Sequence, residues 1–231
     1  MAIVRKYRTK VLASRRILPD VFTITFESLD RPFQYRPGQF LHLALDPYDP
    51  TRSWPESRCF SIQSPPSQGA HALDISFATK GTYTQRMSNE LTVGREIWLK
   101  MPYGDLLAAD YSSSPCVFIA GGTGVSPFLS LFLDDSFARF ANAVLYLGVR
   151  RPEYHVFAPE LEQARRVNPA FAVEVVREDR DGRIPIEQLA TRHGADAVYF
   201  VSGPPAMIRS FREALRAAGI PADHIRTDDW E

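Results

Sequence analysis

Apolar and polar residues alternate along the first half of the chain. Every second residue is apolar in segments 22–26 and 73–78, which is the pattern of a β-strand with one buried face. Pro and Gly residues separate such segments and mark turns. Short strands with turns between them predict an antiparallel β-barrel or sandwich of about six strands. The predicted strands cover residues 7–13, 22–26, 40–45, 59–62, 73–78 and 97–101.

The second half has a different pattern, in which uninterrupted apolar runs alternate with helical segments. Runs without alternation are typical of parallel strands that are covered on both faces. This half therefore predicts an α/β doubly wound parallel five-stranded sheet, and the predicted domains are 1–108 and 109–231. The predicted strands are 116–120, 143–147, 171–176, 197–201 and a weaker one at 224–227, and the predicted helices are 127–140, 155–166, 185–193 and 205–218.

Composition and charge exclude several classes of protein. Lys plus Arg and Asp plus Glu are 27 each in 231 residues, so no net charge favours nucleic acid or membrane. Two cysteines, Cys59 and Cys116, are too few for a four-cysteine iron–sulfur site. The histidines lack metal-ligand spacing, so no metal site is expected. Segment 111–133 carries no charge but is interrupted by Gly and Pro, and the start lacks an apolar signal core, so we expect a cytoplasmic protein with no membrane span.

A glycine-rich turn follows the first predicted strand of the second half. It reads Gly121-Gly-Thr-Gly-Val-Ser-Pro127 and precedes a predicted helix. Such a turn lets the backbone approach a phosphate, while the helix N-terminus supplies N–H donors. A tight turn without a ligand is the alternative. Ser202-Gly203-Pro204 lies at the carboxyl end of a later strand, the edge where open α/β sheets bind ligands, although it also fits an ordinary turn.

Two segments of the first half carry residue types that a flavin needs. Arg58-Cys59-Phe60-Ser61 offers a cation for phosphate, a flat ring for stacking and a hydroxyl donor. Alternation places Arg58 and Phe60 on one face of the strand and Cys59 and Ser61 on the other. The segment Lys80-Gly-Thr-Tyr-Thr84 follows a strand and precedes a short helical stretch, which forms a second group of backbone donors of phosphate size. Each segment alone also fits ordinary strand and turn residues.

In their order along the chain, these motifs resemble the ferredoxin–NADP reductase superfamily. The similarity covers essentially the whole chain and implies an N-terminal FAD-binding barrel followed by an NAD(P)-binding Rossmann-like domain, without a fused iron–sulfur domain. The motifs are Tyr35-Arg-Pro-Gly-Gln-Phe40, Arg58-Cys-Phe-Ser61, Gly81-Thr-Tyr-Thr84, Met101-Pro-Tyr-Gly-Asp-Leu106, Gly121-Gly-Thr-Gly-Val-Ser-Pro127 and Ser202-Gly-Pro-Pro-Ala-Met207.

The resemblance implies roles for particular residues. In the barrel, Arg58 would contact the flavin phosphate, Phe60 would stack on the isoalloxazine, and Ser61 would hydrogen-bond near flavin N5. The remaining implied flavin contacts are Cys59, Lys80, Gly81, Thr82 and Thr84, the last three at the pyrophosphate. The implied nicotinamide-dinucleotide contacts are Gly121, Gly122, Thr123, Gly124, Pro127, Gly203 and Pro204.

The chain departs from the family pattern at several positions. Phe60 stands where Tyr is usual, and Met101 replaces a Gly. Ser202 replaces a Cys that lies beside the nicotinamide in relatives, which puts the rate or orientation of hydride transfer in doubt. Asp228 would stand in for a catalytic acid near the C-terminus. Trp230 would cover the flavin, or else pack with no cofactor role.

Arginines follow the strands where the adenosine ribose of the dinucleotide is expected. Arg150 follows the second strand of the second half and Arg177 the third. Cations serve the 2′-phosphate of NADP, whereas NAD sites commonly place a carboxylate there. We therefore expect NADP, with NAD as the alternative, although solvated loop arginines would look the same.

The sequence thus predicts a flavoenzyme that passes a hydride from NAD(P)H to FAD and then single electrons to a separate acceptor. That acceptor would be a ferredoxin, a flavodoxin or an oxygenase component, and we expect a monomer. Basic residues that precede Asp20 form either a solvated strand face or a docking patch for an acidic partner. Two other functions stay open: a flavin reductase that releases free reduced flavin, and a non-catalytic nucleotide-binding subunit of an oxidoreductase complex.

Overall fold

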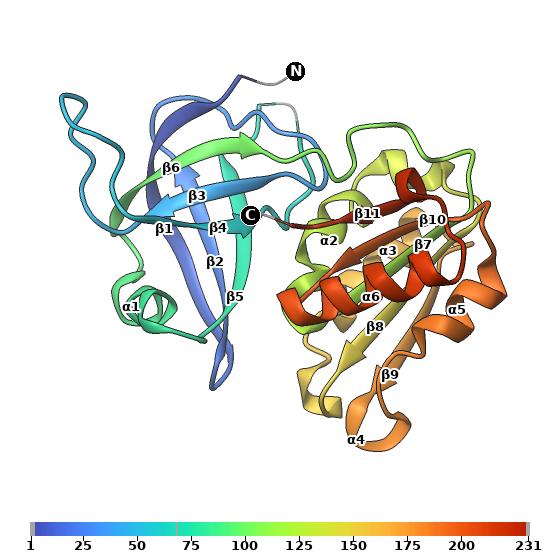
Figure 1. Cartoon of the computed structure of the whole chain (residues 1–231). Coiled ribbons are helices and arrows are strands. Elements are labelled where there is room, and N and C mark those ends of the chain that lie inside the picture. Colours follow the sequence, from blue (N-terminus) through green and yellow to red (C-terminus); the bar gives the residue numbers. More distant parts are fainter. Residues whose placement is uncertain (1–2, 68, 230–231) are drawn as a thin grey trace. The chain divides into compact units, whose positions relative to one another are not determined.

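The computed structural model describes residues 3–67 and 69–229 of the chain. The contacts divide the chain into two compact units, Met1–Asp105 and Leu106–Glu231 (Figure 1).

The first unit is a six-stranded antiparallel sheet in the order β4-β3-β6-β1-β2-β5. The backbone N–H of Gln63, just after β4, donates to the Asp74 carbonyl of β5 at 2.9 Å, and the Asp74 N–H donates to Ser64 Oγ at 2.9 Å. These bonds join the two edge strands and close the sheet into a barrel. The strands are β1 (Arg5–Leu18), β2 (Val21–Ser28), β3 (Phe40–Ala44), β4 (Ser57–Ser61), β5 (Ala72–Ala78) and β6 (Glu96–Tyr103).

The inner face of the barrel is apolar because alternate strand residues point into it. Tyr7, Ile24, Leu41 and Leu99 are all fully buried in one core cluster. This arrangement confirms the strands predicted from the period-two pattern.

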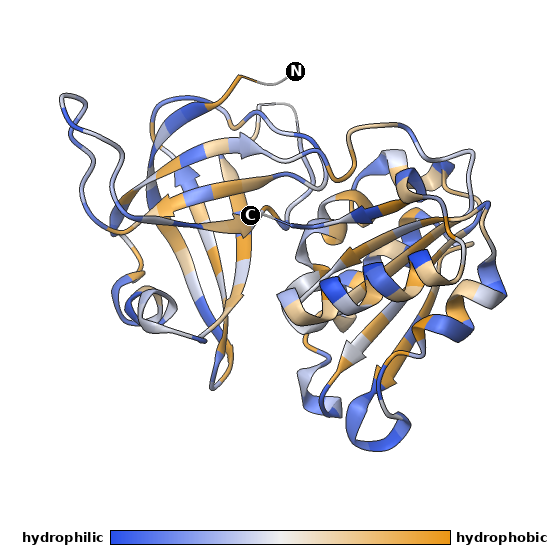
Figure 2. Ribbon diagram, viewed as in Figure 1, coloured by the Kyte–Doolittle hydropathy of each residue, from blue (hydrophilic) through white to orange (hydrophobic). Residues whose placement is uncertain are grey.

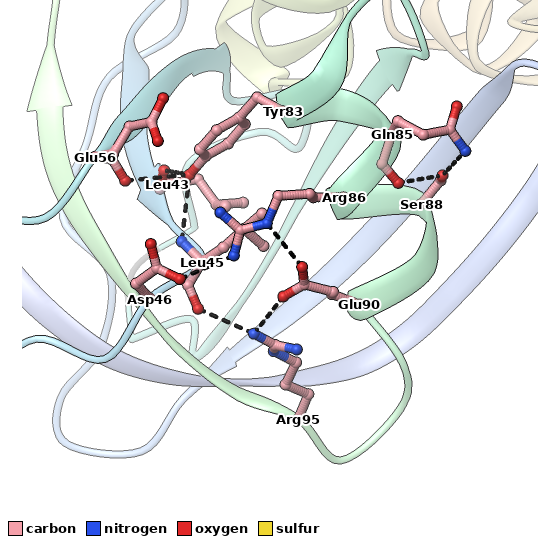
Figure 3. A network of polar contacts seen from close by, with 10 residues as sticks. All are labelled: Leu43, Leu45, Asp46, Glu56, Tyr83, Gln85, Arg86, Ser88, Glu90 and Arg95. Atoms are coloured by element: carbon pink, nitrogen blue, oxygen red, sulfur yellow. Dashed lines mark hydrogen bonds and ion pairs between the residues drawn. The ribbon is translucent and has the colours of Figure 1, made fainter.

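Helix α1 (Thr82–Glu90) is tied to the barrel by a network of polar contacts (Figure 3). The phenol of Tyr83 donates to the Leu43 carbonyl at 2.6 Å and accepts from the Leu45 N–H at 3.2 Å. Arg86 pairs with Asp46 at 2.8 Å and with Glu90 at 2.9 Å. The Arg86 hydrogen bond is the main cause that lowers the pKa of Glu90. The start of α1 is therefore held against strand β3.

We expect Tyr83→Phe to lower the free energy of unfolding by about 1–2 kcal/mol, because the Leu43 carbonyl of β3 and the Leu45 N–H just after β3 lose their hydrogen-bond partner. Burial raises the pKa of Tyr83 to about 12, above the value of about 10 in an unfolded chain. The contribution of the phenol to stability is therefore complete below pH ~10 and is lost as the pH rises towards the folded-state pKa. Urea unfolding at neutral and alkaline pH measures both effects. An alkaline loss of stability that is equal in the two proteins would contradict this assignment.

The second unit is a five-stranded parallel sheet in the order β11-β10-β7-β8-β9. Its strands are β7 (Cys116–Gly121), β8 (Ala143–Val149), β9 (Ala172–Arg177), β10 (Val198–Ser202) and β11 (Ile225–Thr227). The helices are α2 (Ser126–Phe132), α3 (Ala158–Val167), α4 (Glu178–Asp181), α5 (Ile186–His193) and α6 (Pro205–Ala217), with 3-10 helices η1 (Gly122–Val125), η2 (Asp135–Arg139), η3 (Pro152–Tyr154) and η4 (Ala222–His224).

Both faces of this sheet are buried, as the uninterrupted apolar runs predict. Along β7, Phe118 joins a core cluster with residues of α2 and α3, whereas its neighbour Val117 joins a cluster with residues of α5 and α6. In Figure 2 the strands of this sheet are mostly coloured as hydrophobic, while α6 alternates between hydrophobic and hydrophilic positions. The predicted fold class, an antiparallel barrel followed by a doubly wound five-stranded parallel sheet, is confirmed.

Two helical segments differ from the prediction. The helix predicted over 127–140 ends at Phe132, and a separate 3-10 helix begins at Asp135. The Asp134 side chain accepts the Ser136 N–H and so starts a new segment. The four-residue α4 was not predicted, because Glu178–Asp181 contains only charged residues. No helix within the described residues is long and apolar enough to cross a membrane.

Candidate functional site

An anion-binding arrangement lies where β4 meets the start of α1. The Arg58 guanidinium lies 4.8 Å from the ring centroid of Tyr83, the second residue of α1. It also pairs with Glu56 at 2.7 Å and donates to the Ser57 carbonyl at 2.9 Å. Because Arg58 is exposed, its ion pair with Glu56 is worth about 0–1 kcal/mol and can be exchanged for another anion.

The loop before α1 is shaped by the Thr84 hydroxyl. It accepts the backbone N–H groups of Lys80 at 2.9 Å and Gly81 at 3.1 Å, and it donates to the Gly81 carbonyl at 3.0 Å. Gly81 provides no side-chain cap, and a Cβ added there would meet nothing within 4 Å. Among the described residues the Thr82 N–H has no acceptor, as is usual for the first N–H groups of a helix. A helix N-terminus beside an arginine is suited to a phosphate, so these residues fit the phosphates of a flavin nucleotide.

The residues that follow Arg58 alternate between the two faces of the barrel. Phe60 pairs with Leu41 in the β3–β4 ladder, and its buried ring packs at 6.0 Å against Phe77. The structure therefore places Phe60 in the barrel core, and its stacking on an isoalloxazine stays a prediction. Cys59 lies on the outer face with its sulfur 3.6–3.7 Å from both ring nitrogens of His42. Equal distances place this sulfur over the imidazole ring rather than in line with one nitrogen.

A polar group that was not predicted from the sequence continues the outer face of the barrel beyond Ser61. The Ser76 hydroxyl donates to Gln63 Oε1 at 2.5 Å and lies 2.8 Å from the Thr23 hydroxyl. All four side chains are buried. The period-two pattern contained the signal, because Ser61 and Gln63 are two residues apart in an extended segment.

In the second unit, the two glycine-containing turns pack directly against each other. A Cβ on Gly124 would lie 2.6 Å from Gly203 Cα and 2.7 Å from the Ser202 carbonyl oxygen. A Cβ on Gly121 would lie 2.8 Å from Met207 Sδ and 3.1 Å from Pro204 Cδ. These glycines therefore permit close packing of the β7 and β10 turns. Gly124 thus has a packing role, and its predicted contact with the dinucleotide stays a prediction.

Gly122 is the glycine of this turn that faces open space. Its φ is +56°, a conformation that favours glycine, and an added Cβ would meet nothing within 4 Å. The turn continues through η1 before α2 begins, and Ser126 Oγ donates to the Thr123 carbonyl at 2.8 Å. The segment after the glycines is therefore a 3-10 turn rather than the start of a long helix. Pro127 lies in the first turn of α2 as predicted and is buried.

Two of the residues predicted to be catalytic contact each other. Ser202 Oγ donates to Asp228 Oδ2 at 3.0 Å, and the Asp228 N–H donates to the Val201 carbonyl at 3.0 Å. Arg212 donates to Thr227 Oγ1 at 2.8 Å and forms an ion pair with Asp229. The segment after β11 is thus fixed to the carboxyl end of β10. Trp230 lies outside the described residues.

The predicted ribose-site arginines lie at the ends of adjacent strands. Val149 pairs with Arg177, so Arg150 follows β8 beside the last residue of β9. The Asp181 carboxylate accepts the Arg177 backbone N–H at 3.0 Å and lies 3.7 Å from the Arg177 Nε. The hydrogen bond from Arg180 is the main cause that lowers the pKa of Asp181. Arg150 is exposed, and within the described part of the chain no carboxylate pairs with it. The α4 residue Asp181 therefore pairs with Arg177 and not with Arg150, and the contact of either arginine with a nucleotide stays a prediction.

Comparison with known proteins agrees with this fold. Residues 118–213 match the oxidoreductase NAD-binding domain. The structure aligns with a ferredoxin NADP⁺ reductase from Neisseria gonorrhoeae, solved with bound FAD and NADP, with a TM-score of 0.80 and 19% identity over 96% of this chain and 98% of that one. The chain thus contains an oxidoreductase NAD-binding domain and has the fold of ferredoxin–NADP reductase-like proteins, in agreement with the resemblance found in the sequence.

Two curated relatives are named as reductase components of monooxygenases. The chain is 28% identical to the reductase component of propane 2-monooxygenase from Rhodococcus jostii (strain RHA1), over 98% of this chain and 64% of that protein. It is also 28% identical to the reductase component of phenol 2-monooxygenase from Pseudomonas sp. (strain CF600), over 89% of this chain and 60% of that protein. The chain therefore spans less than two thirds of the length of these relatives.

Proposed function

We propose that the chain is a flavin-dependent reductase that takes a hydride from NADPH and passes single electrons to a separate acceptor protein. The observation that carries this proposal is the anion site made by Arg58 and the N-terminal end of α1, in a chain whose other unit matches an oxidoreductase NAD-binding domain. Bound FAD would supply the redox chemistry, by accepting two electrons and releasing them one at a time.

The chain's own residues bind and orient the two nucleotides in this proposal. Arg58 and the first N–H groups of α1 hold the flavin phosphates, and Ser61 offers a hydroxyl to the ring. The backbone of Gly122 and Thr123 holds the dinucleotide phosphates. Arg150 favours NADPH over NADH, because a guanidinium binds the 2′-phosphate in a bidentate manner.

Two further residues fix the carboxyl end of β10. Ser202 and Asp228 hold each other through the 3.0 Å bond between their side chains. Because Ser202 already donates to a carboxylate, its hydroxyl can present only its oxygen to a bound nicotinamide. In the family that the sequence resembles, a cysteine thiol takes the place of this hydroxyl. The difference is the reason to expect altered hydride transfer.

The acceptor class follows from the relatives, which are reductase components of monooxygenases. We propose an oxygenase component, a ferredoxin or a flavodoxin as the acceptor. Release of free reduced flavin is the less favoured function, since the phosphate site beside Arg58 is built to retain the nucleotide.

An anaerobic absorbance titration tests the proposed function. The purified protein, loaded with FAD and freed of excess flavin by gel filtration, should keep a flavin spectrum and lose it on addition of NADPH. NADH should require a higher concentration. Flavin that is retained but not bleached by either nucleotide would identify a non-catalytic subunit, and the loss of flavin on the column would favour the free-flavin reductase.

A further inference from the structure

The outer face of the barrel carries a buried polar row that the binding roles above leave unused. Gln63, Ser76 and Thr23 are each less than 10% exposed, although the apolar core of the barrel lies on the opposite side of β5, at Ile75 and Phe77. Ser76 and Thr23 are direct partners in the β2–β5 ladder. Burial of polar side chains is unfavourable unless they are hydrogen-bonded, so these three residues need hydrogen-bond partners.

The row fixes the orientation of one amide group. Gln63 Oε1 accepts the Ser76 hydroxyl at 2.5 Å, and Ser76 Oγ lies 2.8 Å from Thr23 Oγ1. With its oxygen bound to Ser76 of β5, the Gln63 amide has its Nε2 hydrogens left for another acceptor. Among the described residues Nε2 makes no hydrogen bond, so the fixed amide has donors available for a ligand.

The position of Gln63 relative to Ser61 indicates which ligand these donors suit. The two residues are separated by one residue in an extended segment, so their side chains leave the same face about 6–7 Å apart. The three fused six-membered rings of a flavin are long enough to contact both the Ser61 and the Gln63 side chains. The pyrimidine ring of a flavin carries two carbonyl oxygens, which accept hydrogen bonds, and negative charge collects on this ring when the flavin is reduced.

We infer that Gln63 binds the pyrimidine carbonyl edge of the flavin, next to Ser61, and that Ser76 and Thr23 are positioning residues that fix its amide. This inference rests on the proposed function. A donor aimed at the ring that gains negative charge binds the reduced form more tightly than the oxidised form. Gln63 therefore raises the reduction potential of the bound flavin.

The midpoint potential of the flavin-loaded protein, measured against a reference dye, tests this inference. We expect Gln63→Leu to reduce the preference for reduced over oxidised flavin about ten-fold, which is a potential about 30 mV more negative for a two-electron couple. Ser76→Ala keeps the amide but frees it to rotate, so it should shift the potential in the same direction by less. This second variant keeps the test available if Gln63→Leu does not fold.

Thr25→Val is the matched control, because Thr25 lies on the same face of β2 and its hydroxyl donates to Asp74 at 2.6 Å rather than to the row. It should leave the potential unchanged. An unchanged potential in both Gln63→Leu and Ser76→Ala overturns the inference while the proposed function stands. A wild-type protein that binds no flavin overturns both.

Discussion

Gly124→Ala should destabilise the second unit by about 1–3 kcal/mol and weaken NADPH binding, because overpacking against fixed atoms forces a shift. The three atoms that the new Cβ would meet are Gly203 Cα at 2.6 Å, the Ser202 carbonyl oxygen at 2.7 Å and Gly203 N at 2.8 Å. All three are backbone atoms, so the β10 turn has to move. Because the β7 turn packs against the β10 turn, the same movement disturbs Gly122 and Thr123, whose backbone we propose holds the dinucleotide phosphates.

Urea unfolding and NADPH titration measure the two effects of Gly124→Ala. Gly81→Ala is the control, since its φ is −164° and an added Cβ meets nothing within 4 Å. That variant should stay within about 0.5 kcal/mol of the wild type. Wild-type stability of Gly124→Ala would show that the two turns are not packed as described.

Arg58→Ala should weaken FAD binding about 10- to 100-fold, because a hydrogen bond to a charged group is worth about 1.5–3 kcal/mol. The stability of the protein should change little, since the ion pair between Arg58 and Glu56 is exposed. Glu56→Gln should act in the opposite direction, because it removes the carboxylate that competes with the flavin phosphate for the guanidinium.

Fluorescence quenching of added FAD measures these affinities. Arg52→Ala provides a control for the loss of a positive charge in the same unit, as Arg52 is exposed in the loop between β3 and β4. Equal FAD affinities of Arg58→Ala and Arg52→Ala would remove Arg58 from the phosphate site.

The strands could be predicted because the burial of their faces determines the spacing of apolar residues in the sequence. One buried face gives alternation, as at 97–101, and two buried faces give an uninterrupted run, as at 116–120. Helix α4 could not be predicted, since it is held by ion pairs such as that between Arg180 and Asp181 at 2.6 Å rather than by an apolar face.

The candidate site was only partly predictable for a related reason. Local spacing suggested the phosphate loop at Gly81–Thr84 and the hydroxyl of Ser61. The role of Gly124, by contrast, depends on a contact with Gly203, which is far away in the sequence. The orientation of the Gln63 amide depends in the same way on Ser76, a residue of another strand. Such contacts arise from tertiary packing and leave no periodic signal in a single sequence.

The bonds of Tyr83 to the backbone of β3 have a thermodynamic consequence. They join the helix end that would hold the flavin phosphates to the centre of the barrel core, so both belong to one cooperative unit. A ligand that binds only the folded form shifts the folding equilibrium by mass action. Occupancy of the nucleotide site and resistance of the barrel to heat should therefore rise together, and preparations that differ in cofactor content should differ in melting temperature.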